Sequence, residues 1–301
     1  RQIFTELDRV MKPGAILATN TSALDINEIA SMTQRPQDVI GLHFFSPANV
    51  MKLLEIVRAK YTADDVVATC MALAKDINKI ATLVGVCPGF VGNRILFARQ
   101  IQANKLVYQG VMPWDVDAAL NEFGFKMGPF QMSDLAGLDI GWSEGAKTEN
   151  PIRDALCELD RRGQKTAAGF YDYDENRRPV PSDVTAGIIR DITGAEPSTM
   201  RAQEIIETCI YPMINEAVKI LEENKAQRPS DIDVVWLNGY GFPPDKGGPM
   251  FYGDMVGAQA VLEVMERLGS DDAEFAPAET LRTLAASGGK FNDIDTGGLK
   301  V

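Results

Sequence analysis

The fold of the amino-terminal part is decided by residues 15–57, AILATNTSALDINEIASMTQRPQDVIGLHFFSPANVMKLLEIV. Three apolar runs of strand length lie in this stretch, at 15–19, 39–42 and 52–57. The segments between them are polar or contain Pro, Asn and Ser, which favour turns and helix entries. The stretch therefore predicts three short strands joined by turns and one short helix.

Helical patterns flank these strands. Residues 2–11 carry Ile3, Leu7 and Val10 at helical spacing, and Asp25 with Glu28 fits a capping box that opens a short helix. Residues 63–78 predict another helix, which precedes a last strand at 80–86. Its expected buried side consists of Val66, Val67, Cys70, Leu73, Ala74 and Ile77.

Alternation of helices and strands over 1–86 is typical of an α/β sheet. No strand precedes the first helix, and the sequence G-x-G-x-x-G, which binds dinucleotide phosphates, does not occur in the chain. We therefore expect 1–86 to be the C-terminal half of a Rossmann-like doubly wound domain, with the first half outside this chain.

The rest of the chain predicts helices in two copies of one module. The motifs DVD at 115–117 and GPF at 128–130 recur as DID at 231–233 and GPM at 248–250. Long helices are expected before each copy, at 89–109 and 202–223, the second with a kink at Pro212. A Gly-, Pro- and charge-rich segment at 162–183 is expected to be an ordered surface loop or linker between the copies.

The predicted fold class is therefore α/β followed by all-α. Three domains are expected: a truncated Rossmann-like α/β domain at 1–86, a first helical domain at 87–185 and a second, duplicated one at 186–301.

Composition excludes several classes of function. The chain has 301 residues, of which 45% are hydrophobic and 24% charged, as in ordinary globular proteins. Its formal net charge of -12 disfavours nonspecific nucleic-acid binding, and no apolar run is long enough to span a membrane. The single histidine excludes a multi-histidine metal site, and the four dispersed cysteines predict reduced thiols in a cytosolic protein.

Polar residues gather where two predicted strands end. Asn20 and Ser22 follow the run at 15–19, and His43 follows the run at 39–42. Ligands of open α/β sheets bind at the carboxyl ends of strands, so this edge is a candidate site. Asn20 and Ser22 are also common helix-entry or turn residues, and that structural interpretation stays open.

His43 and Glu55 form a candidate acid–base pair. Glu55 lies inside an apolar strand, where a carboxylate requires a partner. If the segment 44–52 reverses the chain, the antiparallel pairing places Glu55 opposite or diagonal to His43. A carboxylate on one ring nitrogen fixes the tautomer for general acid–base catalysis, although a purely structural pair that closes a hairpin remains the alternative.

An ordered set of motifs resembles the L-3-hydroxyacyl-CoA dehydrogenase family. The motifs are NTS at 20–22, HFFSP at 43–47, MKLLE at 51–55, GFVGNR at 89–94, FGFKMGPF at 123–130, DLAGL at 134–138 and GQKT at 163–166. The second copy, with NGYGF at 238–242 and GGPM at 247–250, resembles the duplicated C-terminal domain of multifunctional fatty-acid β-oxidation enzymes. Those enzymes join an enoyl-CoA hydratase to the dehydrogenase.

The resemblance implies NAD-dependent oxidation of L-3-hydroxyacyl-CoA to 3-ketoacyl-CoA. It implies that His43 is the general base, that Glu55 orients it, and that Ser22 and Asn93 position the substrate oxygen. Asn93 at the start of a helix also has a structural interpretation, as a cap or turn residue. Asn20, Ser22 and Ser46 are implied to contact the nicotinamide cofactor.

The resemblance also implies partners and a setting. An acyl-CoA is the expected substrate, no nucleic acid or membrane is expected as a partner, and a homodimer would form through the helical domains. The hydratase and first nucleotide-binding segments are expected to be missing, so that the fragment alone would bind NAD poorly. Bacterial cytoplasm is expected rather than peroxisome, because the C-terminus GGLKV carries no serine-lysine-leucine signal.

The sequence offers two alternatives to this function. In the first, the duplicated helices form a non-catalytic association module of a multifunctional enzyme. In the second, the chain is another hydroxyacid dehydrogenase, of the 6-phosphogluconate type, which relies on a catalytic lysine. The pairing of His43 with Glu55 argues against the second.

Overall fold

The computed structural model describes residues 2–145 and 147–299. The chain forms two compact units, one made of the residues up to Ala98 together with those from Ile210 onward, the other of Arg99–Cys209. The first unit holds the sheet and the second helical copy.

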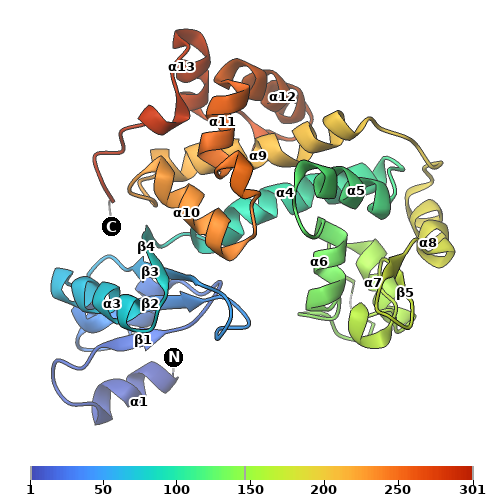
Figure 1. Cartoon of the computed structure of the whole chain (residues 1–301). Helices are drawn as coiled ribbons and strands as arrows, with labels where there is room; N and C mark the ends of the chain where they lie inside the picture. Colours follow the sequence, from blue (N-terminus) through green and yellow to red (C-terminus); the bar gives the residue numbers. More distant parts are fainter. Residues whose placement is uncertain (1, 146, 300–301) are drawn as a thin grey trace. The chain divides into compact units, whose positions relative to one another are not determined.

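A four-stranded sheet forms the amino-terminal half of the first unit (Figure 1). Its strands are β1 (Leu17–Thr19), β2 (Val39–Phe44), β3 (Leu53–Arg58) and β4 (Ile80–Gly85), in the order β1-β2-β3-β4. β1 and β2 are parallel, β2 and β3 antiparallel, and β3 and β4 parallel. All four predicted strands are confirmed, each within two residues of its predicted start.

The two faces of the sheet have different neighbours. Side chains of Ile40, Leu42, Leu54 and Ile56 pack against helix α3 (Asp64–Asp76), which lies across one face in Figure 1. Because side chains alternate along a strand, His43 and Glu55 belong to the opposite face. That face meets the second helical copy, whose α10 (Pro229–Gly239) contacts β3 and β4.

The expected buried side of α3 is only partly correct. Val66, Val67 and Cys70 are buried with Ala74, but Leu73 and Ile77 are 43% and 42% exposed. The sheet covers a narrower stripe of the helix than the apolar pattern predicts.

The two helical copies share the same succession of a long, a middle and a short helix. In the first copy these are α4 (Phe90–Tyr108), α5 (Pro113–Phe123) and α6 (Pro129–Ala136). In the second they are α9 (Ala202–Glu222), α10 and α11 (Pro249–Val256).

The repeated aspartates explain why the two motifs recur. Asp117 accepts hydrogen bonds from the backbone N–H groups of Phe130 (3.0 Å) and Gln131 (2.8 Å) at the start of α6. Asp233 accepts the equivalent bonds from Met250 (2.7 Å) and Phe251 (3.2 Å) at the start of α11. Each carboxylate thus caps the next helix, which gives the repeated aspartate a structural role.

The remaining elements complete the two units. The segment 162–183 is ordered by hydrogen bonds, because the carboxylate of Asp134 accepts the backbone N–H groups of Phe170 and Tyr171.

The other elements are α1 (Gln2–Val10), α2 (Ile26–Ala30), η1 (Pro36–Asp38), α7 (Pro151–Glu158), η2 (Gln164–Thr166), β5 (Asp172–Tyr173), β6 (Pro179–Val180), α8 (Asp183–Thr193), η3 (Pro244–Lys246), α12 (Ala258–Asp271), η4 (Ala273–Phe275), α13 (Glu279–Ser287) and η5 (Phe291–Asp293).

The compact units do not follow the order of the predicted domains. The second helical copy joins the sheet through a backbone hydrogen bond from Gly85 to Lys225 (2.8 Å) and a bridge between Val84 and Ala226. The domain boundaries at 86 and 185 stay a prediction. Across 2–145 and 147–299, no helix has both the length and the apolar composition that crossing a membrane requires.

Candidate active site

The centre of the site is the pair formed by His43 and Glu55. Antiparallel pairing of β2 with β3 places the two residues directly opposite each other, as predicted. The imidazole Nδ1 lies 2.7 Å from Glu55 Oε2. Glu55 is fully buried and His43 is 6% exposed, so the bond is shielded from water. Since Nδ1 is bound to the carboxylate, Nε2 is the ring nitrogen left for a ligand.

The second oxygen of the carboxylate is held by the helix that follows the sheet. Glu55 Oε1 accepts a hydrogen bond of 2.9 Å from the backbone N–H of Gly92, in the first turn of α4. Unpaired N–H groups and the helix dipole at this end both favour a negative charge. Both oxygens of the carboxylate are therefore held, one by the imidazole and one by the start of α4.

A tight turn at residues 87–90 directs the start of α4 toward Glu55. The Phe90 N–H donates to the Cys87 carbonyl (3.0 Å), and Pro88 and Gly89 (φ 75°) occupy the central positions, as in a type II turn. Phe90 itself has φ 53, which is unusual for a bulky residue, and its ring is 1% exposed. This strained turn places Phe90 against the imidazole, with ring centroids 5.5 Å apart.

Aromatic rings enclose the imidazole. Besides Phe90, the ring of Phe45 lies 4.6 Å from that of His43. Phe45 in turn makes an edge contact of 5.3 Å with Tyr240, from the second helical copy. An apolar surround of this kind lowers the local dielectric and strengthens the bond between His43 and Glu55.

Asn93 and Asn20 are each tied to the site by one hydrogen bond. Asn93, half-buried beside Gly92, accepts a bond of 2.8 Å from the hydroxyl of Tyr240 on its Oδ1. Asn20, just after β1, accepts the backbone N–H of Phe44 (3.1 Å) on its Oδ1 and so joins the ends of β1 and β2. The predicted convergence of these strand ends is confirmed.

Ser22 and Ser46 are not brought to the pair. Both are exposed, and within the part of the chain that the structure describes neither is hydrogen-bonded to His43 or Glu55. Ser22 is also not the cap of α2, a role that Asp25 fills by accepting the Asn27 N–H at 2.7 Å.

Sequence reasoning missed three contributors to the site: the backbone N–H of Gly92, the flanking rings of Phe45 and Phe90, and the hydroxyl of Tyr240. Phe45 and Phe90 lie in the motifs HFFSP and GFVGNR, beside His43 and near Asn93, so their positions in the sequence could have indicated them. Nothing in the sequence pattern predicts the contact of Tyr240 with Asn93, since 147 positions separate them.

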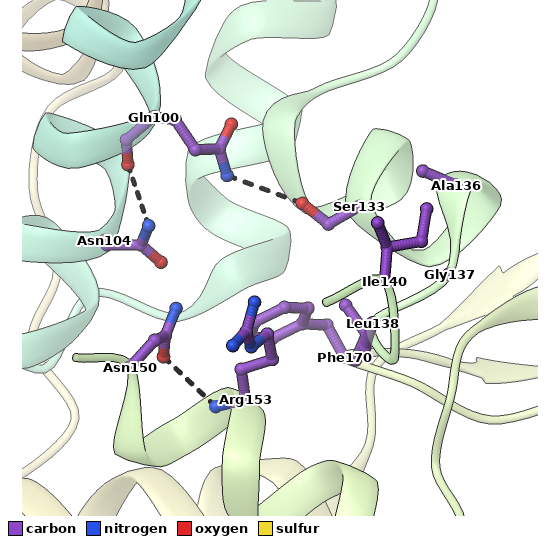
Figure 2. A pocket seen from close by; sticks show the side chains of 10 residues that line it. All are labelled: Gln100, Asn104, Ser133, Ala136, Gly137, Leu138, Ile140, Asn150, Arg153 and Phe170. Carbon is purple, nitrogen blue, oxygen red and sulfur yellow. Dashed lines mark hydrogen bonds between the residues drawn. The ribbon is translucent and has the colours of Figure 1, made fainter. Parts of the chain in front are cut away.

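A separate pocket lies within 99–209 (Figure 2). Its volume is about 320 Å³, and Arg153 and Phe170 are among the side chains that line it in Figure 2. Most of its other polar groups already serve the fold: Asn104 donates to the Gln100 carbonyl (2.9 Å), and Asn150 caps α7 by accepting the Arg153 N–H (3.1 Å). None of its lining residues is a predicted site residue.

The cysteines take no part in the site. All four are unpaired and buried. Burial raises the pKa of the Cys209 thiol to about 12 and that of Cys87 to about 11, so neither is a thiolate nucleophile at neutral pH.

The fold and the site together define an α/β protein with a histidine–carboxylate acid–base pair and a duplicated helical part. The chain belongs to the 3-hydroxyacyl-CoA dehydrogenase family. Residues 1–87 match the family's NAD binding domain, and its C-terminal domain matches twice, over 89–173 and 205–294.

Known relatives agree with this assignment. The chain is 47% identical to the human peroxisomal bifunctional enzyme over 316 residues, which cover 96% of the chain and 44% of the enzyme. It is 36% identical to the fatty acid oxidation complex subunit alpha of Vibrio cholerae, with 97% of the chain and 42% of the subunit covered. The chain thus spans less than half the length of these curated relatives.

Solved structures show the same fold. One is 3-hydroxybutyryl-CoA dehydrogenase from Escherichia coli, with a TM-score of 0.78, 25% identity, and 95% of this chain and 79% of that chain covered. Another is the dehydrogenase part of multifunctional enzyme 1 from Caenorhabditis elegans, with a TM-score of 0.66, 34% identity, and coverage of 94% and 67%.

One expectation is corrected by these matches. The expectation that the N-terminal half of the Rossmann domain is missing is contradicted, because the NAD-binding domain family matches all of 1–87. The expectation rested on the absence of a strand before the first helix and on the absence of the sequence G-x-G-x-x-G. The order of helices and strands at the start of the chain therefore does not show how much of the family's NAD binding domain the chain contains.

Proposed function

We propose that this chain carries out NAD-dependent oxidation of L-3-hydroxyacyl-CoA to 3-ketoacyl-CoA in fatty-acid β-oxidation. The observation that carries the proposal is the continuous chain of contacts from His43 through Glu55 to the Gly92 N–H, at 2.7 and 2.9 Å. Such a chain orients one imidazole for proton transfer.

In this mechanism His43 acts as the general base. Its Nε2 removes the proton of the 3-hydroxyl while the C3–O bond becomes a carbonyl. The carboxylate of Glu55 holds the proton on Nδ1 and stabilises the imidazolium that results. The Gly92 N–H holds that carboxylate in place. Asn93 would position the substrate oxygen through the N–H groups of its amide.

NAD, when bound, would supply the acceptor for the hydride that leaves C3. The residues present fit its nicotinamide end, because the exposed hydroxyls of Ser22 and Ser46 follow β1 and β2 at the edge where His43 lies. Asn20 would contribute its amide N–H groups, since its Oδ1 is bound to Phe44. We assign no residue to the pyrophosphate, because G-x-G-x-x-G does not occur in the chain.

The wider setting is also proposed by analogy with the relatives. A multifunctional β-oxidation enzyme, with a hydratase part, is the parent that they suggest. A homodimer through the helical domains and a cytoplasmic location stay predictions. The second candidate function is a non-catalytic association module of a multifunctional enzyme, formed by the duplicated helices.

A spectrophotometric assay tests the proposal. The chain is expected to oxidise NADH with acetoacetyl-CoA as substrate, followed at 340 nm. His43→Ala and Glu55→Gln are expected to lower kcat by roughly 10²- to 10⁴-fold, the usual contribution of general acid–base catalysis. Glu28→Gln, which changes an exposed carboxylate of the same sheet domain, serves as the matched control.

A second readout does not depend on turnover. Since His43 is the chain's one histidine, its ring ¹⁵N signals are assigned without ambiguity. The neutral ring is expected to carry its proton on Nδ1 in the wild type and to lose this preference in Glu55→Gln. Equal kcat in wild type and His43→Ala would refute the assignment, whereas folded, self-associating protein without turnover would support the association module.

A further inference from the structure

We propose that Tyr240, from the second helical copy, is a positioning residue for Asn93 and through it for the dehydrogenase site. The inference rests on the function proposed above. It assigns to the duplicated module a direct share in the site on the sheet.

The hydroxyl of Tyr240 determines which side of the Asn93 amide faces the substrate. It donates a hydrogen bond of 2.8 Å to Asn93 Oδ1. An amide has one acceptor oxygen and one donor nitrogen, so a fixed Oδ1 also fixes Nδ2. The donor side of Asn93 then remains available to a substrate oxygen.

The ring of Tyr240 covers the backbone that binds Glu55. A Cβ added at Gly92 would lie 2.4–2.7 Å from three atoms of the Tyr240 side chain, so this close approach requires glycine. The same Gly92 donates its N–H to Glu55 Oε1. Tyr240 therefore contacts two adjacent residues, Gly92 and Asn93, that serve the catalytic pair and the substrate respectively.

Neighbouring rings hold Tyr240 in place. Trp236, which is fully buried, stacks on it with centroids 4.5 Å apart and planes 23° apart. Tyr240 also makes a T-shaped contact with Phe45, with centroids 5.3 Å apart, and the Phe45 ring packs on His43. The hydroxyl is thus positioned by a rigid aromatic cluster.

Comparison of the two copies shows that this arrangement is specific to the second. The sequence NEFGF at 121–125 is equivalent to NGYGF at 238–242, so Phe123 takes the place of Tyr240 and has no hydroxyl. Likewise Glu122 takes the place of Gly239, where a Cβ would lie 2.4 Å from Leu53 Cδ2 of β3. The glycine lets the second copy approach the sheet, and the tyrosine supplies the polar contact there.

Tyr240→Phe is the test, because it removes the hydroxyl and keeps the ring. We expect kcat for acetoacetyl-CoA reduction to fall about tenfold, with KM for NADH unchanged, since about one hydrogen bond's contribution to orientation is lost. The matched control is Tyr252→Phe, which alters a buried tyrosine of the same copy away from Asn93. Its kcat is expected to stay within twofold of wild type.

A double-mutant cycle separates positioning from general loss of structure. If Tyr240 acts through Asn93, Tyr240→Phe has less than a twofold further effect in an Asn93→Ala background. An equal tenfold loss in both backgrounds, or no loss in the wild-type background, would overturn the proposal.

A measurement without turnover distinguishes this inference from the proposed function. In ¹⁵N spectra the side-chain amide signals of Asn93 are expected to shift and to exchange faster with water in Tyr240→Phe. If wild type lacks dehydrogenase activity, the proposed function fails and these signals alone decide whether Tyr240 fixes the amide. Unchanged Asn93 signals would overturn the positioning role even in an active enzyme.

Discussion

Substituting Gly92 by alanine tests the packing that supports the active site. The residue lies in the first turn of α4, and its φ is not in the left-handed region, so alanine is compatible with the backbone. The new Cβ would lie 2.4 Å from Tyr240 Cε2 and 2.5 Å from its Oη. Ordinary contacts between carbon atoms are about 3.5–4.0 Å, so the ring or the start of α4 must move by about 1 Å or more.

The cost follows from three contributions. Overpacking of a well-filled site costs roughly 1–3 kcal/mol. Displacement of Tyr240 also breaks its hydrogen bond to Asn93, which costs about 1 kcal/mol. The higher helix propensity of alanine stabilises the folded state by about 1 kcal/mol and offsets part of this loss. We therefore expect Gly92→Ala to lower the free energy of unfolding by about 1–3 kcal/mol.

Chemical denaturation followed by circular dichroism measures the loss. The matched control is Gly187→Ala in α8, where a Cβ meets nothing within 4 Å. In this control the free energy of unfolding is expected to stay the same or to rise by up to about 1 kcal/mol, because only the higher helix propensity of alanine acts there. kcat of Gly92→Ala is expected to fall at least tenfold, since Glu55 loses a well-placed N–H.

The reasoning fails if Gly92→Ala is as stable as Gly187→Ala. That result would mean that Tyr240 yields to the new methyl group without loss, and that its ring is not rigidly held. Reduced stability with full activity would show instead that Gly92 matters for packing alone.

Two further predictions concern stability. Arg94 donates from Nε to Glu216 (2.6 Å) and from both terminal nitrogens to Glu223 (2.6 and 2.7 Å), so Arg94→Lys is expected to lower the free energy of unfolding by about 1–3 kcal/mol. The control Arg282→Lys, at an exposed ion pair, is expected to lower it by less than about 0.5 kcal/mol. Equal losses for the two variants in chemical denaturation would refute the argument. Burial raises the pKa of the Asp233 carboxyl to about 7 from 3.8, so the native state binds more protons than the unfolded state between these values. The unfolding free energy of wild type relative to Asp233→Asn should therefore fall as pH rises from about 4 to 7, by at most about 1.4 kcal/mol per pH unit, and a flat or rising difference would contradict the shift.

Local sequence patterns were sufficient for the elements and for the central pair. Short apolar runs bounded by turn residues predicted the strands, because hydrophobic periodicity is a local property. His43 and Glu55 could be paired because 11 residues separate them and an antiparallel reversal leaves few registers. The repeated aspartates were visible as a motif, although their role as helix caps was not.

Only the tertiary structure decided what surrounds that pair. The Gly92 N–H reaches Glu55 because a turn at 87–90 directs α4 at the sheet, and backbone groups carry no sequence signal of their own. Tyr240 reaches Asn93 because the second helical copy packs on β3 and β4. Contacts between distant segments depend on how whole surfaces fit, and neither propensity nor periodicity encodes that fit.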